Sequence, residues 1–403
     1  MTLNGKHVFL GVTGGIAAYK CVELLRLFKK AGADVVVAMT RAATRFVGPA
    51  TFEVLSENPV LLDLWEGPGS GVAHIEVASK SALAVIAPAT ANFIGKLAHG
   101  IADDALTTTM LAMTCPVLIC PSMNTDMYQN IRVQKNLDLL EESGIHILDP
   151  DSGVLACKTA GAGRLPEPWF IFDRACALFY KKDLKGKTIL VSAGPTVEPI
   201  DPVRFLSNHS SGKMGYAIAG AAEKRGARVI LVSGPVSLDP PVGVERVSVG
   251  SCDQMYDAML GSLDQADIII KVAAVGDFKP VSVQAHKIKK NGGQDQDQGY
   301  MTLELTQNKD ILKAIGLKKR KDQYLVGFAA ETRDLETYAK GKMEKKHLDM
   351  IAANIVGKTG SGFKADTNKV KLFTRDGLVT DLPLMPKEKV AHAILDAVVQ
   401  AVS

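Results

Sequence analysis

The sequence predicts an α/β protein of two doubly wound parallel-sheet domains. Apolar strands alternate with helical segments over the first 175 residues, and a charged stretch at 181–186 is followed by a fresh strand. The helix–glycine–strand stretch at 224–229 is similar to the one at 29–35, so the two halves begin alike. At about 100–200 residues per domain, a chain of 403 residues accommodates two. We therefore expect one domain at residues 1–182 and a second at 183–403.

The first half opens with a strand–helix–strand unit. Residues 7–12 form an apolar run that Gly14-Gly15 ends, residues 16–30 carry apolar side chains at helical spacing, and residues 34–39 form a second apolar run after Gly32. Such a unit predicts parallel strands with helices packed on both faces of the sheet. Further strands of this sheet are expected at 82–87, 116–120 and 145–148.

The second half repeats this alternation of strands and helices. Its expected elements are strands at 187–192, 228–232 and 268–270 and a helix at 214–225. Gly226 stands between the helix and the strand that follows it, as a helix stop. Residues 291–299 are rich in Gln, Asp and Gly, and this composition predicts a mobile loop.

Composition and charge exclude several classes of protein. Hydrophobic residues make up 47% and charged residues 22%, which is typical of a well-cored globular chain and not of a disordered one. None of the six cysteines stands in a CxxC pair, so free thiols in a reducing cytoplasm are expected rather than a zinc knuckle or a disulfide framework. The uncharged stretch at 105–125 contains two prolines and Asn124, and it predicts a helix followed by a strand, not a membrane span. The net charge of +4 suits small anionic substrates and indicates no nucleic-acid or membrane partner.

The glycine loop of the first half predicts an anion site. Gly14, Gly15, Ile16 and Ala17 lie between a strand and a helix, where backbone N–H groups and the helix N-terminus favour a phosphate. The spacing is not that of the dinucleotide fingerprint GxGxxG, and a plain tight turn explains the glycines equally well.

Other polar groups are expected at the same edge of the sheet, where such folds bind ligands. Thr13 and Thr40 each close a strand and could add hydroxyl donors, and the stretches 87–92 and 121–124 follow the next two strands. Their shared placement favours a ligand site over a set of ordinary loops.

Two reactive side chains of the first half stand outside these loops. His74 precedes a helix-like stretch, and a lone histidine is more often structural than catalytic. Cys157 lies beside the glycine-rich stretch 160–164, where Lys158 and Arg164 would favour its thiolate. A buried, inert cysteine is the alternative.

Four segments of the first half, at 11–20, 87–92, 100–104 and 121–124, resemble the flavin-dependent cysteine decarboxylases. The whole chain resembles the bifunctional flavoproteins of coenzyme A biosynthesis, which join a phosphopantothenoylcysteine decarboxylase to a phosphopantothenate–cysteine ligase. The resemblance implies a flavodoxin-like, FMN-binding decarboxylase fold followed by a Rossmann-like ligase fold.

The resemblance assigns roles to residues of the first half. The FMN site would comprise Thr13, Gly14, Gly15, Ile16, Ala17, Thr40, Pro88, Ala89 and Thr90. His74 would be the essential histidine, Asn124 would bind the substrate carboxylate, and Cys157 would donate a proton from a flap over the substrate. Lys158 stands where the family usually has Gly, and Leu165 where it usually has Met. Because of these two departures, the resemblance does not determine the geometry of this flap.

The second half has its own anion signals. Small hydroxyl residues and glycines at 207–215 precede a helix, and they favour either an anion site or an ordinary capped helix start. The leading Gly and the final Ser/Thr of a Walker A loop are missing. Lysine clusters at 287–290 and 342–346 indicate either solvated surface or the binding of a triphosphate.

The resemblance also assigns the ligase residues. It places CTP contacts on Lys271, Val272, Ala273, Asp277, Lys287, Lys309, Asp310, Ile311, Leu312, Phe328, Lys342 and Lys346. Asn208 would stabilise an acyl-cytidylate, Lys287 would assist its formation, and Mg2+ would neutralise the triphosphate. Lys309 stands where the family commonly has Pro.

The function that follows from the resemblance has two steps. The ligase would join 4′-phosphopantothenate to L-cysteine with CTP, releasing pyrophosphate and CMP, and the decarboxylase would convert the product to 4′-phosphopantetheine with FMN. The family further implies decarboxylase trimers and ligase dimers within a cytoplasmic homo-oligomer, a dodecamer.

Two other classes of function fit the sequence less well. A non-catalytic flavin-fold interaction protein would be expected to lack His74, Asn124 or Cys157 and to carry a long acidic tail, and the sequence shows neither. A nicotinamide oxidoreductase would need the GxGxxG spacing that the first half lacks.

Overall fold

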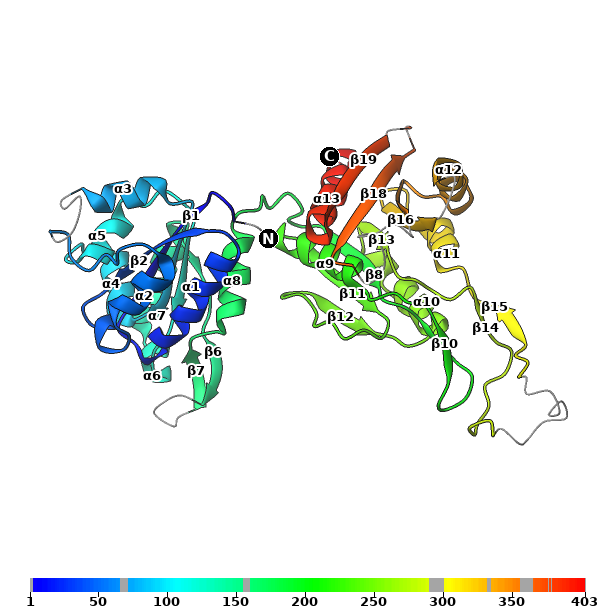
Figure 1. Cartoon of the computed structure of the whole chain (residues 1–403), viewed down its shortest axis with the longest axis horizontal. Helices are drawn as coiled ribbons and strands as arrows, with labels where there is room; N and C mark the ends of the chain where they lie inside the picture. Colours follow the sequence, from blue (N-terminus) through cyan, green and yellow to red (C-terminus); the bar gives the residue numbers. More distant parts are fainter. Residues whose placement is uncertain are drawn as a thin grey trace. The chain divides into compact units, whose positions relative to one another are not determined.

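The computed structural model describes residues 3–65, 72–154, 160–289, 301–331, 335–355, 365–375, 377 and 379–402. The chain divides into two compact units, Met1–Tyr180 and Lys181–Ser403, which are considered separately below (Figure 1). Cys157, Lys158 and the loop expected at 291–299 lie outside the described residues.

A five-stranded parallel sheet forms the centre of the first unit, with the strand order β2-β1-β3-β4-β5. The strands are β1 (His7–Val12), β2 (Asp34–Met39), β3 (Leu83–Ala89), β4 (Val117–Pro121) and β5 (His146–Ile147). This confirms the doubly wound parallel fold expected of the first half. The strand order reverses between β1 and β3, and ligands of such sheets bind at the carboxyl ends of strands beside that point.

Helices cover both faces of this sheet. They are η1 (Ile16–Tyr19), α1 (Lys20–Lys30), η2 (Ala43–Arg45), α2 (Pro49–Ser56), α3 (Ala73–Lys80), α4 (Ala91–Ala98), α5 (Ala105–Leu111), α6 (Thr125–Gln129), α7 (Ile131–Glu142) and α8 (Pro168–Ala177). Leu24 and Phe28 of α1 pack with α8 in one apolar core, and Phe93 of α4 packs with α5 and α7 in another. A short hairpin of β6 (Asp151–Val154) and β7 (Ala160–Arg164) follows the last strand.

The helix expected at 16–30 begins with a 3-10 turn rather than an α-helix. Ile16 and Tyr19 of this turn are 62% and 61% exposed, whereas the apolar face of α1 is buried. The helix ends at Ala31, and Gly32 follows with φ +88, a left-handed conformation that glycine adopts without strain.

An eight-stranded sheet forms the centre of the second unit, in the order β12-β11-β8-β13-β16-β17-β18-β19. The strands are β8 (Thr188–Ala193), β11 (Arg228–Ser233), β12 (Glu245–Ser248), β13 (Ile268–Lys271), β16 (Tyr324–Glu331), β17 (Met350–Ile355), β18 (Thr367–Thr374) and β19 (Val379–Pro386). The first six in this order pair in parallel with Rossmann-like connectivity.

The far edge of this sheet differs from the purely parallel arrangement expected. β18 pairs antiparallel with β17 and with β19, so the sheet is mixed. For the β18–β19 pair the cause is local, because only four residues of the sequence separate the two strands and so short a connection permits only an antiparallel pair.

Helices also cover both faces of the second sheet. They are α9 (Lys213–Lys224), α10 (Cys252–Gly261), η3 (Leu263–Gln265), α11 (Ile311–Lys318), α12 (Leu335–Lys346) and α13 (Lys387–Val402). α9 and α13 share one apolar core, and α10, α11 and α12 contribute to the other. Two small antiparallel ribbons, β9 (Val197–Pro199) with β10 (Phe205–Ser207) and β14 (Phe278–Pro280) with β15 (Leu305–Gln307), extend from this unit (Figure 1).

The uncharged stretch at 105–125 forms α5 and β4, as expected. Among the helices of the described ranges, none is both long and apolar enough to cross a membrane.

Candidate active sites at the carboxyl edges of the two sheets

The glycine loop after β1 has the geometry of an anion cradle. The backbone N–H groups of Gly14, Ile16 and Ala17 make none of the hydrogen bonds found among the described residues, so they are available to a ligand. A Cβ atom on Gly14 would lie 2.4 Å from the Cβ of Ala42, so the close passage of this loop beside residue 42 requires glycine. These groups fit a phosphate monoester such as that of FMN.

The two threonines expected at this edge have different functions. The Thr13 hydroxyl donates to the Pro88 carbonyl at 2.7 Å and accepts from the Thr90 N–H at 3.0 Å, so its proton is used within the protein. Thr40 Oγ1 accepts from the Ala43 N–H at 3.3 Å, which leaves its hydroxyl proton available to a ligand. The hydroxyl donor expected here is therefore Thr40, while Thr13 fixes the turn at 88–90 that follows β3.

His74 lies in the first turn of α3 rather than before it. Its Nδ1 atom is buried and has no hydrogen-bond partner within the described part of the chain. A buried ring nitrogen without a partner is unfavourable, and a ligand that supplies the partner would remove this cost. The residue is therefore suited to hold or to move a proton at Nδ1.

Asn124 forms the N-cap of α6. Its Oδ1 accepts from the N–H groups of Asp126 at 2.9 Å and Met127 at 3.3 Å. Because the cap uses the carbonyl oxygen, the side chain can meet a substrate carboxylate only through its amide N–H donors.

The β6–β7 hairpin is anchored beside Asn124. The Gly163 carbonyl accepts from the Met123 N–H at 3.0 Å and from the Ser122 hydroxyl at 3.2 Å. A Cβ on Gly163 would lie 2.1 Å from the Met123 carbonyl oxygen, so this contact excludes other residues. The structure thus brings the base of the hairpin to Asn124, while Cys157 is among residues 155–159, which are not described.

Leu165 and Arg164 follow the hairpin. Leu165 is buried in the core of the first unit, so this departure from the family lies in the packing below the hairpin. Arg164 forms an ion pair with Glu167 at 2.7 Å, and Lys20 binds the same carboxylate at 2.9 Å. The hydrogen bond from Lys20 is the main cause that lowers the pKa of Glu167.

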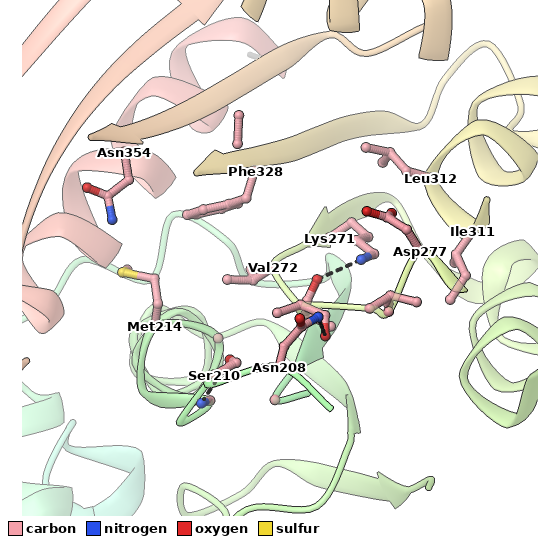
Figure 2. Close-up of a pocket in the computed structure, with 18 of the residues that line it drawn as sticks. Asn208, Ser210, Met214, Lys271, Val272, Asp277, Ile311, Leu312, Phe328 and Asn354 are labelled. Atoms are coloured by element: carbon pink, nitrogen blue, oxygen red, sulfur yellow. Dashed lines mark hydrogen bonds between the residues drawn. The ribbon is translucent and has the colours of Figure 1, made fainter. Parts of the chain in front are cut away.

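A pocket of about 460 Å³ opens at the carboxyl edge of the second sheet. The structure brings together there nearly all the residues that the resemblance assigned to the ligase: Asn208, Lys271, Val272, Ala273, Asp277, Lys309, Asp310, Ile311, Leu312, Phe328, Lys342 and Lys346. Figure 2 shows Met214 and Asn354 at one end and Ile311 and Leu312 at the other, with Asn208 between them.

Three lysines lie at the α11 end of this pocket. Lys271 Nζ donates to the Ala273 carbonyl at 2.6 Å, Lys342 Nζ donates to the Phe328 carbonyl at 2.9 Å, and Lys346 pairs with Asp310 at 2.9 Å. Burial, and then the charge of Lys342, lower the pKa of Lys271 to about 7. Such a cluster is suited to bind a polyanion, which would favour the charged form of Lys271.

The middle of the pocket is neutral and well ordered by hydrogen bonds. Asn208 Nδ2 donates to the Ala274 carbonyl at 3.0 Å, which leaves one amide N–H and the carbonyl oxygen for a ligand. The N–H groups of Val272 and Ala273 both donate to Ser192 Oγ at 3.2 Å. The backbone donors of these two residues are therefore used within the protein and not offered to the pocket.

The α9 end of the pocket combines the stretch 207–215, which the sequence marked as an anion signal, with Asn354, Asn368 and Lys387, which it did not single out. Gly212 is the N-cap of α9 and supplies no side-chain cap, with φ +76. Lys213 and Lys387 line this end, as do Asn354 and Asn368. The Asn354 Oδ1 atom is buried and has no hydrogen-bond partner among the described residues.

Lys309 has contacts that explain how a lysine is accommodated at this position. Its Nζ lies 3.0 Å from Asp253 and 4.7 Å from the centre of the Tyr256 ring. The bond to Asp253 raises the pKa of Lys309. Lys309 thus lines the pocket while its ammonium group is paired with Asp253 of α10.

Lys287 is the one assigned ligase residue that does not line the pocket in this structure. The neighbouring Ile288 donates its N–H to Asp201 at 3.1 Å, and its carbonyl accepts from Arg204 at 2.9 Å. The segment of Lys287 is therefore held beside the β9–β10 ribbon, and contact of Lys287 with the same ligand as Lys271 stays a prediction.

Two family models match the chain. Residues 1–179 match the Flavoprotein family, and residues 184–402 match the DNA/pantothenate metabolism flavoprotein C-terminal domain. The chain is 50% identical over 401 residues to the coenzyme A biosynthesis bifunctional protein CoaBC of Bacillus subtilis, covering 98% of this chain and 97% of that one.

It is 45% identical over 401 residues to the protein of the same name from Escherichia coli K12, covering 99% and 98%. The chain belongs to the CoaBC family.

Solved structures also match parts of the chain. A crystal structure of the C-terminal domain of a CoaBC protein is 43% identical, with a TM-score of 0.47, and covers 55% of this chain and 98% of its own. The FMN-dependent cysteine decarboxylase SpaF is 34% identical, with a TM-score of 0.37, and covers 40% and 91%.

Proposed function

We propose that this CoaBC chain ligates 4′-phosphopantothenate to L-cysteine at the pocket of its second unit and decarboxylates the product at the flavin site of its first. The observation that carries the proposal is the pocket itself. It has three lysines at one end, two at the other, and a neutral amide between them. This distribution suits a nucleotide triphosphate and a second anionic substrate bound together.

The ligase step follows from the middle of the pocket. The substrate carboxylate attacks the α-phosphorus of CTP, pyrophosphate leaves toward Lys271, Lys342 and Lys346, and the cysteine amine then displaces CMP from the acyl carbon. Asn208, held by the Ala274 carbonyl, offers its remaining N–H to the acyl group as charge develops there.

Mg2+ is proposed to bind mainly through the phosphates of CTP rather than through a set of protein ligands. Within the described ranges no cluster of three His, Cys, Asp or Glu side chains could hold a metal ion. Mg2+ is commonly bound through substrate phosphates with one or two carboxylates. Asp277 and Asp310 both line the pocket, and Asp310 is paired with Lys346, so Asp277 is the carboxylate proposed to contact the ion.

The decarboxylase step is assigned to the first unit. Bound FMN would supply reversible two-electron oxidation of the substrate's cysteine thiol, so that the resulting thiocarbonyl group can accept the electrons of the breaking carbon–carbon bond before it is reduced again to the thiol. The loop at Gly14–Ala17 would hold its phosphate, with Thr40 as a hydroxyl donor. Asn124 would orient the substrate carboxylate through its amide N–H groups, and His74 would hold or move a proton at Nδ1. Cys157 would protonate the product.

A homo-oligomer is also part of the proposal. Ile16 and Tyr19 beside the flavin loop are largely exposed apolar side chains, and contacts with further copies of the chain would cover them. A dodecamer remains a prediction from the family, as does a location in the cytoplasm.

One reconstitution tests the function. The purified full chain with FMN, CTP, Mg2+, 4′-phosphopantothenate and cysteine should release pyrophosphate and CO2 together. Asn208→Asp should stop ligase turnover, and with it steady-state pyrophosphate release, but still decarboxylate supplied phosphopantothenoylcysteine, whereas Cys157→Ser should do the reverse. A protein that releases pyrophosphate but no CO2, even with FMN added, would contradict the decarboxylase assignment.

A further inference from the structure

The α11 end of the pocket, where the proposed function places the nucleotide, is attached to a carboxylate outside the pocket. Asp253, in the first turn of α10, faces two lysines that come from different segments. Lys279 of β14 donates to its Oδ2, and the Nζ of Lys309, just before α11, lies 3.0 Å from its Oδ1. Among the described residues that line the pocket, Lys309 is present, whereas Asp253 and Lys279 are not. Asp253 is therefore placed to act on a bound nucleotide through its partners.

Lys309 is attached to α10 by more than this ion pair. Its ammonium group lies 4.7 Å from the centre of the Tyr256 ring, a distance typical of a cation–π contact. Its carbonyl accepts from the Cys252 thiol at 3.5 Å. The Oδ1 atom of Asp253 is buried, so water screens the pair less than it screens a fully exposed one. The side chain and the backbone of Lys309 are thus both bound to the same helix.

Lys279 attaches a second segment to the same carboxylate. Its ribbon, β14 with β15, ends immediately before Asn308. Asn308 donates its N–H to the Asp277 carbonyl and its Nδ2 to the Gly276 carbonyl, each at 2.8 Å. Because all three of these residues line the pocket, the two lysines fix one continuous stretch of its wall.

The position of this stretch determines the charges that a nucleotide would meet. Asp310 follows Lys309 directly, forms the N-cap of α11 and pairs with Lys346 at 2.9 Å. Ile311 and Leu312, the next residues, lie at the same end of the pocket (Figure 2). A shift of residues 308–310 would therefore move a carboxylate relative to the lysines that are proposed to bind phosphate.

We propose that Asp253 is a positioning residue of the ligase, which holds Lys309 and Lys279 so that the pocket wall at 308–312 keeps the arrangement that binds the nucleotide. This role rests on the proposed function, in which CTP binds at the α11 end. Lys309 is then a tether of the pocket wall, and its ammonium group does not bind phosphate. A wall that is held in place before the nucleotide arrives lowers the entropy cost of binding.

The test measures ligase kinetics of the full chain with 4′-phosphopantothenate, cysteine and Mg2+ while CTP is varied. Asp253→Asn should raise the KM for CTP about fivefold, the size of one partly shielded ion pair, and leave kcat and the KM for 4′-phosphopantothenate within about twofold. Lys309→Met, which removes the ammonium group but keeps a long unbranched side chain, should have a similar effect. Asp257→Asn is the matched control, because Asp257 is exposed, lies one turn further along α10 and acts on Lys309 through its charge rather than a hydrogen bond.

A double background separates positioning from other roles. In Lys279→Met/Lys309→Met, a further Asp253→Asn change should alter the KM for CTP by less than about twofold, because the partners of the carboxylate are gone. A further fivefold rise there would overturn the proposal.

An unchanged or lower KM for CTP in Asp253→Asn would also overturn it, since a lower value means that the carboxylate repels the triphosphate or withholds Lys309 from it. A fall in kcat with a rise in both KM values would assign Asp253 a general structural role instead. Should Asp253→Asn fold poorly, Lys309→Met decides alone, at a side chain that is 49% exposed, and an unchanged KM for CTP would then refute the proposal. A wild-type chain that makes no product from CTP, 4′-phosphopantothenate and cysteine would contradict the proposed function itself.

Discussion

The proposed anion sites of the two units lie at equivalent places in their sheets but differ in chemistry. The first unit uses the backbone N–H groups of the Gly14–Ala17 loop and the Thr40 hydroxyl, and its nearby Lys20 is bound to Glu167 and the Leu165 carbonyl. The second unit has six lysines around one pocket: five lie at its two ends, and the sixth, Lys309, is paired with Asp253.

This difference matches what each site is proposed to bind. Neutral, directional donors suit one phosphate group of a cofactor that stays in place through many turnovers. Lysine charges act over a longer range and are screened by salt, so they suit polyanionic substrates that arrive from solution and leave again. The predictions below test whether the two sites are as separate as this contrast implies.

The largest expected effect is confined to the first unit. His74→Asn should lower the decarboxylation rate of supplied phosphopantothenoylcysteine about 1,000-fold, because it removes a group placed to transfer a proton. Pyrophosphate release by the ligase should not change. His99→Asn is the control, since His99 is exposed and bonds only to Asn136 among the described contacts. A parallel loss of ligase activity would show that the two sites are coupled.

A smaller effect is expected from the glycine loop. Gly14→Ala should weaken FMN binding about 100-fold, because the new Cβ would lie 2.4 Å from Ala42 Cβ and 2.9 Å from its carbonyl carbon, so the backbone must move. Loss of about two well-placed hydrogen bonds to a charged group accounts for this size. Flavin fluorescence titration measures it.

The matched control for this variant is Gly48→Ala, because a Cβ at residue 48 meets nothing within 4 Å. Tight FMN binding by Gly14→Ala would show that the loop does not hold the phosphate.

Much of this contrast could be predicted from the sequence. The glycines at 14–15 and the position of Asn208 before a helix marked both loops, and parallel strands place such loops at one edge. The use of individual hydrogen bonds could not be predicted. Ser192 Oγ accepts from the N–H groups of Val272 and Ala273, and the Pro88 carbonyl accepts from the Thr13 hydroxyl. Buried donors are paired with acceptors that the tertiary structure brings near, and these are distant in the sequence.

One part of the α9 end of the pocket, Lys387, was missed for a different reason. Lys387 reaches it only because the antiparallel β18–β19 hairpin returns the chain to the sheet before α13 begins. A lysine after a proline at a helix start is ordinary in a sequence, so nothing local distinguished it. The alternation of buried and exposed residues in β18 was the available signal for the hairpin.

The nucleotide end of the pocket should respond to the loss of a single charge. Lys346→Gln should raise the KM for CTP about 20-fold, the size expected for one charge-assisted hydrogen bond to phosphate. FMN affinity should stay the same. Lys345→Gln on the same helix is the control, because Lys345 is exposed and does not line the pocket. Equal effects of the two variants would indicate general attraction rather than a defined contact.

Salt should separate the two sites without any substitution. Raising NaCl from 50 to 300 mM shortens the screening length by more than half, so kcat/KM of the ligase for CTP should fall about tenfold. Decarboxylation of the supplied intermediate with FMN already bound should change less than twofold. If both rates fell together, the neutral character inferred for the first site would be wrong.

The smallest expected effect is on pH dependence, and Lys271 is its source. Burial lowers the pKa of this lysine to about 7 in the free protein, so its amine loses charge as the pH rises above 7. Triphosphate favours the charged form, and binding should therefore take up a proton. The KM for CTP should rise about fivefold from pH 7 to 8, and Lys271→Met should abolish the rise.

Lys271 also makes the stability of the free protein depend on pH, in the opposite direction: a higher pH weakens CTP binding but stabilises the free protein. Between pH 7 and the pKa of an unfolded lysine, the unfolded chain binds more protons at this residue than the folded one, so its contribution makes the free energy of unfolding increase with pH. Calorimetry of CTP binding in two buffers of different ionisation enthalpy measures the proton uptake directly. Binding without proton uptake at pH 8 would mean that Lys271 is already charged in the free pocket, and that its neighbours compensate one another without a nucleotide.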